Sequence, residues 1–364
     1  MINIPLRAII SGGVADPFAI SEEYVFYTGN DANQYYRKYD IVADSFTTLQ
    51  SFARPAVNTP VGSNGTFIFM QGSSGSRMGQ WAWTGAALTN RYEASLTGGN
   101  KNQGFFCVRP DGGRTVVALK SMDFGQGIQS KRYQLAPAYS YTAAWSNGDA
   151  NHNWDQVADF RVASPGTSGY GDTVVGLPTS NGGSTQSLTF SSGVGTAHST
   201  ITFAYGGGAR RAGWDRDSGL IAIANGSGGT TLALYQLNMT TRALTSIGTS
   251  SALTGTGYAA ACVKGFIVVV ESANNLRSYT RSGTTLTLVN TLASPFGGSS
   301  NTAASMTVSP FSNLIYAHNG NGNGFVFSIS DAGVLTKKAS IAQSNTRLMN
   351  QVFTFIGTTA LPTV

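Results

Sequence analysis

A short apolar segment followed by a polar tract rich in Gly, Asn and Ser recurs along this chain of 364 residues. The clearest copy is residues 314–317 (LIYA), which precede the tract HNGNGNG. Its central residue Tyr316 and the equivalent Val269, Ala222 and Val175 are separated by steps of 47 residues. A repeat of this length indicates that each unit buries its apolar surface against the neighbouring units.

Three further copies continue the series towards the N-terminus, centred on Phe26, Ile68 and Val117 at less regular steps of 42, 49 and 58 residues. The seven apolar segments are residues 24–27, 67–70, 116–119, 173–176, 220–223, 267–270 and 314–317. Repeats with a period in the forties are typical of β-propellers.

Each copy is surrounded by further short runs that alternate between apolar and polar residues and are bounded by turn residues, so a unit predicts four β-strands. The sequence therefore predicts an all-β fold, a seven-bladed β-propeller with four-stranded blades, as one domain covering residues 1–364. The expected blades span approximately residues 14–53, 56–96, 104–146, 157–204, 209–250, 257–293 and 302–343.

The second strand of each unit is apolar throughout, as expected of a strand that is packed on both faces. The fourth strands are the most polar, as expected of an exposed outer edge. Residues 5–11 and 349–357 lie outside the seven units and are expected to be strands that close the ring. A partial eighth blade is the alternative.

Charged residues make up only 11% of the chain, and the 23 basic and 17 acidic residues form no dense cluster. A nucleic-acid partner would need a basic patch with interleaved aromatic residues, so none is predicted. No apolar run is long enough to span a membrane. The N-terminal sequence lacks the long apolar segment of a signal peptide, so we expect synthesis in a cytoplasm.

Motifs for common catalytic and cofactor sites are absent from the sequence. Residues 149–155 (DANHNWD) contain two carboxylates but not the full acidic pattern of a calcium loop. No Gly-x-Ser-x-Gly motif joins a strand to a helix. The Gly-rich tracts at residues 206–208 and 319–324 have no following helix that could hold a phosphate. We therefore expect no cofactor and no metal.

The seventh unit carries a likeness to a known family. Residues 308–310 (VSP), 313–316 (NLIY), 325–329 (FVFSI) and 333–336 (GVLT) resemble a blade of the lactonase-type seven-bladed propellers, which include bacterial phosphogluconolactonases and are similar to Trp-Asp-repeat propellers. The resemblance implies a lactonase site of Glu, Arg and His side chains in the central channel. The histidines, His152, His198 and His318, do not occupy equivalent positions, so this cluster is not predicted.

A second resemblance is one of composition. Low charge, abundant Gly, Ser, Thr and Asn, and irregular blades are similar to tailed-phage virion proteins. This resemblance implies a non-enzymatic structural or attachment component in a virion, present in multiple copies, with capsid or tail proteins and a host surface polysaccharide as partners. The alternatives are a lactonase- or glycosidase-like hydrolase with a site in the central channel, and a soluble lectin. A convergent cluster of ionisable side chains at the axis would separate the hydrolase from the other two.

Aromatic residues in the long connection between the third and fourth units, and in the long fourth unit itself, are candidates for partner or glycan contact, because long loops on a rigid scaffold often bind. These candidates are Trp145, His152, Trp154 and Tyr170. Packing of the two tryptophans between blades is an equally weighted alternative.

The two cysteines test the register of the repeat. Cys107 in FFCVR and Cys262 in AACVK are each followed by Val and a basic residue, so both are expected on innermost strands, of the third and sixth blades. These strands would be too far apart for a disulfide, and we expect two free, buried thiols.

Overall fold

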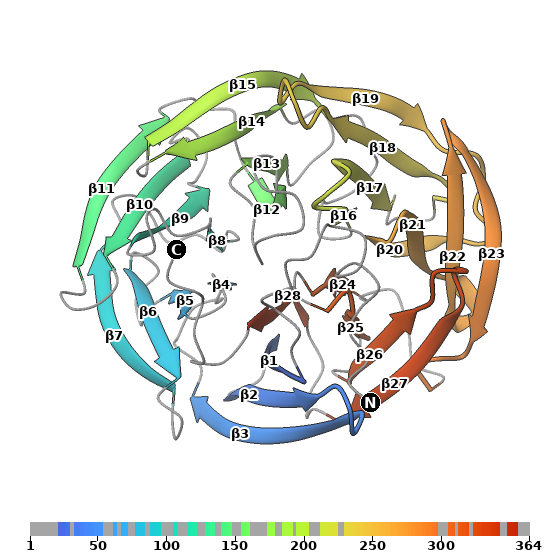
Figure 1. Cartoon of the computed structure of the whole chain (residues 1–364), viewed down its shortest axis with the longest axis horizontal. Coiled ribbons are helices and arrows are strands. Elements are labelled where there is room, and N and C mark those ends of the chain that lie inside the picture. The colour runs from blue at the N-terminus through green and yellow to red at the C-terminus, as the bar shows by residue number, and fades with distance from the viewer. Residues whose placement is uncertain are drawn as a thin grey trace, which may run out of the picture.

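The protein is an all-β molecule whose computed structural model is drawn in Figure 1. The structure describes residues 21–29, 33–53, 61–63, 67–71, 77–83, 88–95, 105–107, 115–121, 128–134, 140–147, 154–160, 173–178, 184–191, 194–203, 212–224, 229–297, 305–309, 312–319, 323–342 and 348–355. Within these ranges the chain forms seven four-stranded antiparallel sheets and one short 3-10 helix, η2 (Ser272–Asn274). None of its described helices has the length and apolar character needed to cross a membrane.

The sheets stand around a common centre, and we number them in chain order of their second strands (Figure 1). The innermost strands are β28 (Leu348–Phe355), β4 (Val61–Ser63), β8 (Phe105–Cys107), β12 (Trp154–Phe160), β16 (Ala212–Trp214), β20 (Gly257–Val263) and β24 (Ser305–Val308). The second strands are β1 (Glu22–Gly29), β5 (Phe67–Gln71), β9 (Thr115–Ser121), β13 (Thr173–Pro178), β17 (Leu220–Ala224), β21 (Phe266–Glu271) and β25 (Ile315–His318).

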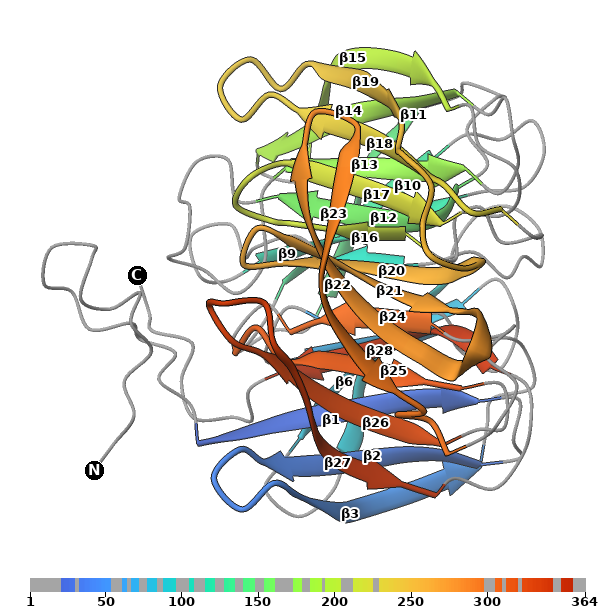
Figure 2. The same cartoon turned by 90° about the vertical axis from the view of Figure 1, so that its right-hand side faces the viewer.

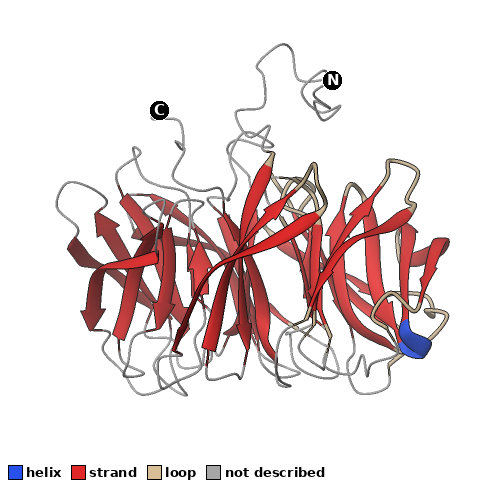
Figure 3. Cartoon of the chain, turned by 90° about the horizontal axis from the view of Figure 1, so that it is seen from below, coloured by secondary structure: helices blue, strands red, loops and turns tan. Residues whose placement is uncertain are grey.

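The two outer positions complete each sheet. The third strands are β2 (Asn33–Asp40), β6 (Arg77–Trp83), β10 (Ile128–Gln134), β14 (Ser184–Ser191), β18 (Leu232–Leu237), β22 (Asn275–Ser282) and β26 (Gly324–Ile329). The fourth strands are β3 (Ser45–Ala53), β7 (Leu88–Ser95), β11 (Ser140–Asn147), β15 (Val194–Thr202), β19 (Leu244–Thr249), β23 (Thr285–Ala293) and β27 (Leu335–Ile341). All strands run between the two faces of a disc (Figure 3).

The second strand β21 is apolar from Phe266 to Val270 because each of its faces contacts a different neighbouring sheet. In β21, Phe266, Val268 and Val270 pack against the seventh sheet, whereas Ile267 and Val269 pack against the fifth. Side chains alternate between the faces of a strand, so a strand buried on both faces needs a continuous apolar run. The expectation from the sequence is confirmed for this strand.

The apolar core lies between neighbouring sheets. Four described clusters fill the junctions of the fourth with the fifth, the fifth with the sixth, the sixth with the seventh, and the seventh with the first sheet. At the junction of the sixth and seventh sheets, Phe296 is 1% exposed. Its ring makes edge contacts with those of Phe325 and Phe327, with ring centroids 5.0 and 5.6 Å apart. Burial of such rings is a main source of stability in a domain with no helical layer.

In each of the seven sheets, the fourth strand contains one extra residue relative to the third strand. The residue that lacks a register partner is Leu49, Arg91, Ala144, His198, Ile247, Val289 or Lys338, in chain order. Such a β-bulge bends and twists an outer strand, and this discourages edge-to-edge pairing with another molecule. Figure 2 shows the outer strands β23 and β27 running obliquely across the rim.

The first sheet takes its innermost strand from the C-terminal end of the chain. In β28, Phe353 is opposite Phe26 and Val352 is opposite Tyr27 of β1. Pairing of residues near 349–357 with the first sheet is thus observed. In this sheet β28 holds the innermost position beside β1, and the part of the expected first blade that precedes residue 21 lies outside the described residues. Residues 5–11, the other expected closing strand, lie outside the described residues.

The cysteine positions agree with the predicted register. Cys107 ends β8 and Cys262 lies in β20, and both strands are innermost in their sheets. Cys262 is a free thiol with 2% exposure, and burial raises its pKa. A buried thiol of this kind behaves as a small apolar side chain.

Candidate functional site

The structure places two of the four aromatic and histidine candidates in strands. Trp145 lies in β11, the outer strand of the third sheet, and Trp154 begins β12, the innermost strand of the fourth. One is therefore at the rim and the other near the centre, and the fold does not bring them together (Figure 1). His152 and Tyr170 lie outside the described residues. Contact of these four residues with a partner or glycan stays a prediction.

A different set of residues converges near the common centre of the sheets. The carboxylate of Asp159 accepts hydrogen bonds from the indole Nε1 of Trp214 at 3.0 Å and from Nε of Arg216 at 2.9 Å. The Nη1 atom of Arg216 donates to the backbone oxygen of Val308 at 3.1 Å. We call Asp159, Trp214, Arg216 and the Val308 carbonyl the axial cluster.

A tight turn between β16 and β17 presents Arg216. The Asp215 side chain accepts hydrogen bonds from the backbone N–H groups of Asp217 and Ser218. The N–H of Gly219 donates to the Asp215 carbonyl at 3.0 Å, and Gly219 has a φ of +80°, which favours glycine. An aspartate at the start of a turn often bonds its own backbone in this way. The turn therefore holds Arg216 in a fixed direction.

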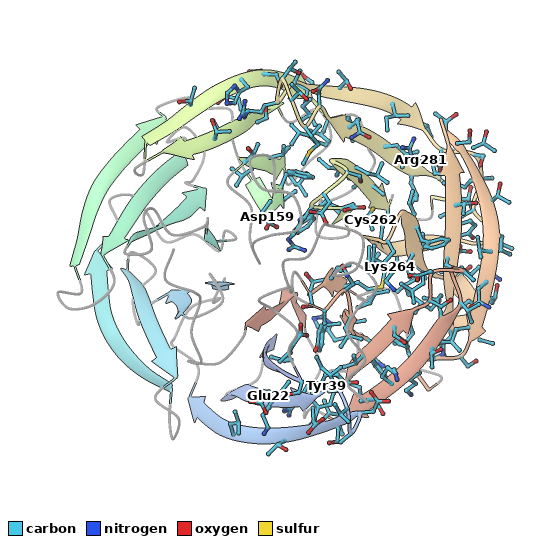
Figure 4. All side chains as sticks on the ribbon, viewed as in Figure 1. Glu22, Tyr39, Asp159, Cys262, Lys264 and Arg281 are labelled. Carbon is cyan, nitrogen blue, oxygen red and sulfur yellow. The ribbon has the colours of Figure 1, made fainter. Side chains whose placement is uncertain are left out.

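The contacts of Arg216 locate it at the axis. The residue follows β16 of the fifth sheet, yet its guanidinium bonds Asp159 of the fourth sheet and Val308 of the seventh. The sixth sheet stands between the fifth and the seventh in the ring, so a single side chain can link them only close to the centre. Figure 4 shows Asp159 beside the centre, in contrast to Arg281 near the rim.

Burial makes the axial ion pair a rigid arrangement. The side chain of Asp159 is 2% exposed and that of Arg216 is 10% exposed. The guanidinium carbon of Arg216 lies 5.7 Å from the centre of the Trp214 ring, which adds a cation–π contact. Within the described residues, Nη2 of Arg216 has no hydrogen-bond acceptor, whereas Nε and Nη1 are both engaged. The cluster thus offers a fixed, positively charged donor.

Another buried ionisable group lies away from the axis. Glu271 accepts hydrogen bonds from Arg277 at 2.5 Å and from the hydroxyl of Tyr279, beside the connection that contains Thr254. Burial and the bond to Glu271 raise the pKa of Tyr279. Glu271 is fully buried, and these bonds join β21 to β22 and to the connection that contains Thr254. No cluster of three metal-binding side chains occurs in the described ranges.

Sequence reasoning missed the axial cluster, although it contained one signal. Asp159 interrupts an otherwise apolar segment, VADF, in an innermost strand. A carboxylate at such a position must find a partner, because an unpaired buried charge is costly. The partner Arg216 is 57 positions away, in a turn that sequence analysis treats only as a structural feature.

Comparison with known proteins identifies similar folds. No protein-family model and no curated protein sequence matches the chain. The chain is similar to a candidate 6-phosphogluconolactonase from Bacteroides fragilis, with 13% identity, a TM-score of 0.61, and coverage of 92% of this chain and 98% of that one. A second, from Bacteroides uniformis, has 12% identity, a TM-score of 0.59, and coverage of 92% and 100%.

A third similar structure is the periplasmic gluconolactonase of Pseudomonas aeruginosa, with 10% identity, a TM-score of 0.61, and coverage of 94% of this chain and 100% of that one. At such identities the likeness establishes the fold. It confirms an all-β, propeller-like fold of the lactonase type. The resemblance to tailed-phage virion proteins finds no support in these structures.

These neighbours correct the predicted function. The expectation of a non-enzymatic structural or attachment component of a virion is wrong, because the similar structures are named lactonases. The expectation that the chain is not an enzyme is contradicted by the same finding. The names of these neighbours agree better with the hydrolase alternative than with the virion expectation. Virion partners, a host polysaccharide and a virion location stay predictions.

Proposed function

We propose that the protein is a hydrolase that opens lactone rings, with its site at the axial cluster. The observation that carries the proposal is the buried pair of Asp159 and Arg216 at the centre of the ring. The likeness to proteins named lactonases supports the same class, although fold alone never decides function.

Arg216 is the proposed catalytic residue, and Asp159 and Trp214 are positioning residues. Asp159 fixes the guanidinium through Nε, and Trp214 holds the second carboxylate oxygen of Asp159. The Nη2 donors of Arg216 are then aimed in a fixed direction at low solvent exposure. Hydrogen-bond donors that are fixed in advance stabilise developing negative charge strongly in such surroundings.

The reaction requires only water as a co-reactant. The water oxygen adds to the carbonyl carbon of the lactone, and the carbonyl oxygen takes up negative charge beside Arg216. Collapse of this intermediate breaks the bond between the carbonyl carbon and the ring oxygen. The proton lost by the water goes to the departing alkoxide, and the product is a hydroxy acid.

The finer architecture belongs to the same proposal. We infer one domain of seven blades around a single axis, in which pairing of β28 with β1 closes the ring. The order of strands in the seven described sheets and the register of β28 support this arrangement. A closed ring matters for the site, because the axial cluster draws on the fourth, fifth and seventh sheets.

The test is hydrolysis of a panel of γ- and δ-lactones by the purified protein, followed as acid release in a pH-stat. We expect turnover above the buffer rate, and Arg216→Gln should lower kcat/KM by about 10²- to 10³-fold. Because this variant leaves Asp159 buried without its charged partner, the double variant Asp159→Asn/Arg216→Gln is tested beside it. Thermal denaturation establishes that each variant is folded.

Lys264→Gln is the matched control. Lys264 occupies the equivalent turn of the sixth sheet and pairs with Asp331 at 2.9 Å, but it is 31% exposed and lies off the axis (Figure 4). Its removal should leave the rate unchanged. Turnover that never exceeds the buffer rate, or that is equal in the wild type and Arg216→Gln, rules out the proposed site.

A further inference from the structure

Glu23 is a buried carboxyl group at the junction between the first and seventh sheets. It is the second residue of β1 and has 0% exposure. Its oxygens accept hydrogen bonds from the hydroxyl of Tyr316 at 2.5 Å and from the hydroxyl of Ser309. Both donors belong to the seventh sheet or the turn that follows β24, so the contact joins the first sheet to the seventh.

No described cation neutralises Glu23. Besides Glu23, the ionisable side chains of β1, β2 and β25 are Glu22, Tyr24, Tyr27, Tyr35, Tyr36, Arg37, Lys38, Tyr39, Asp40, Tyr316 and His318. Glu22 pairs with Lys38 at 3.0 Å, and Arg37 donates to Thr48. The β28 sequence, LMNQVFTF, contains no ionisable residue. Burial raises the pKa of Glu23, and the hydrogen bonds from Ser309, Tyr316 and Ser312 oppose that rise.

The junction is connected to the axial cluster through one peptide unit. Ser309 directly follows Val308, whose carbonyl oxygen accepts the hydrogen bond from Nη1 of Arg216. The N–H of the same peptide, on Ser309, donates to the Leu314 carbonyl at 2.8 Å. A continuous series of contacts therefore runs from Glu23 through Ser309 and the Val308 carbonyl to Arg216.

Protonation of Glu23 changes what Ser309 can do. An ionised carboxylate only accepts, so the hydroxyl groups can donate to it. A protonated carboxyl group carries an O–H donor, and one of the hydroxyl groups of Ser309, Tyr316 and Ser312 must then turn to accept. A turn of the Ser309 side chain acts on the peptide unit that holds Arg216.

We propose that Glu23 is a pH-sensitive positioning residue that couples the junction of the first and seventh sheets to the axial cluster. Its effect on turnover rests on the proposed function, whereas its effect on the geometry of the cluster does not. Figure 4 labels Glu22 and Tyr39 beside the junction of the first and seventh sheets, and Asp159 near the centre. These labels mark the regions that the series of contacts from Glu23 to the axial cluster connects.

The sign of the pH effect follows from the burial of Glu23. Its pKa in the folded chain is raised, so the folded state holds this proton more tightly than the unfolded state. The contribution of Glu23 to stability is complete below the pH at which an unfolded glutamate titrates, about 4.3, and is lost as the pH rises through the folded pKa. The unfolding constant should rise by up to about tenfold per pH unit in this window, relative to Glu23→Gln.

The coupling is measured at the indole N–H of Trp214, which donates to Asp159. The chain has only five tryptophans, so their indole signals separate in a ¹H–¹⁵N spectrum, and Trp214→Phe assigns the signal. In the wild type we expect this signal to shift with the titration of Glu23, followed by its ¹³C carboxyl resonance. In Glu23→Gln the indole signal should stay constant over the same pH range.

Two variants of the donors distinguish the route. Ser309→Ala removes the link to the Val308 peptide, so the Trp214 signal should no longer follow Glu23. Tyr316→Phe removes a different donor to Glu23 and leaves that link intact. In this matched variant the midpoint should move, but the Trp214 signal should still follow it.

The readout does not depend on catalysis, so failure of the lactonase proposal leaves it interpretable. If Glu23 titrates in the wild type while the Trp214 signal stays constant, the coupling is wrong and Glu23 only joins the two sheets. If the signal follows Glu23 equally in Ser309→Ala, the proposed route is wrong. If the unfolding constants of the wild type and Glu23→Gln keep the same ratio at every pH, Glu23 is not the pH-sensitive group.

Discussion

Single residues near the axis are constrained by how closely neighbouring sheets approach. Gly213 in β16 is buried, and a Cβ atom added there would lie 2.4 Å from the Cα of Ala261 in β20. Contacts below about 3 Å are repulsive for carbon atoms, and backbone cannot move away as a flexible side chain can. The glycine is therefore required by space rather than by its own backbone conformation.

Gly213→Ala should lower the free energy of unfolding by roughly 3 kcal/mol, as overpacking does in rigid cores. Urea denaturation measures the loss. Gly297→Ala serves as the control, because Gly297 has a φ of +73° and no atom within 4 Å of an added Cβ, so it reports the cost of the left-handed backbone alone. That cost is about 1 kcal/mol. Equal losses in both variants would mean that the sheets do not meet closely at Gly213.

At the scale of strands, two of the described junctions between sheets each contain a hydrogen bond from a serine hydroxyl of a third strand to a backbone carbonyl of the next sheet. Ser187 of β14 donates to the Arg242 carbonyl, and Ser278 of β22 donates to the Gly333 carbonyl, each at 2.6 Å. The positions equivalent to these serines, next to the β-bulge, are Leu234 and Val326 in the fifth and seventh sheets. The fifth and seventh sheets therefore have an apolar side chain where the fourth and sixth have this serine-to-carbonyl contact.

Ser278→Ala should lower the free energy of unfolding by about 1–2 kcal/mol, because it leaves the buried Gly333 carbonyl without its donor. Ser187→Ala should cost less, since its contact is only partly buried. The two losses should add in the double variant, because the serines belong to different junctions. Thermal denaturation checks the series, with the exposed Ser246 replaced by Ala as a control that should change stability by less than about 0.5 kcal/mol. A loss in Ser246→Ala as large as in Ser278→Ala would contradict the assignment.

At the scale of the whole molecule, the repeat predicts the architecture but not its register. Phe26, Val175, Ala222 and Tyr316 do occupy one equivalent position, opposite the third-strand residue that precedes the bulge. The equivalent residues in other sheets are Phe69, Leu119 and Val268, one or two positions from the Ile68, Val117 and Val269 chosen by spacing. A strand that is apolar on both faces gives no alternation from which the phase could be read.

The axial cluster could not be predicted for a related reason. Arg216 meets Asp159 and Val308, which are 57 and 92 positions away, because the sheets are arranged in a ring around them. Sequence spacing reports the length of a unit, whereas this contact depends on which sheets face each other across the centre. The same holds for the contact of Glu23 with Tyr316, 293 positions apart.

The last prediction concerns closure of the ring by β28. A chain that ends at residue 347 lacks β28, so β1 loses its partner and exposes an unpaired edge. We expect this chain to unfold at a melting temperature lower by at least about 10 °C, equivalent to several kcal/mol for a domain of this size. It should also associate in size-exclusion chromatography, because an open edge can pair with another chain.

A chain that ends at residue 356 is the matched control, because it retains β28 whole. It should melt and elute like the full-length protein. A synthetic peptide of residues 348–356, added to the shorter chain, should restore part of the lost stability by adding a strand to β1. If the chain ending at 347 melts at the same temperature as the control, β28 does not close the ring, and the axial contacts of the seventh sheet must be held by another part of the chain.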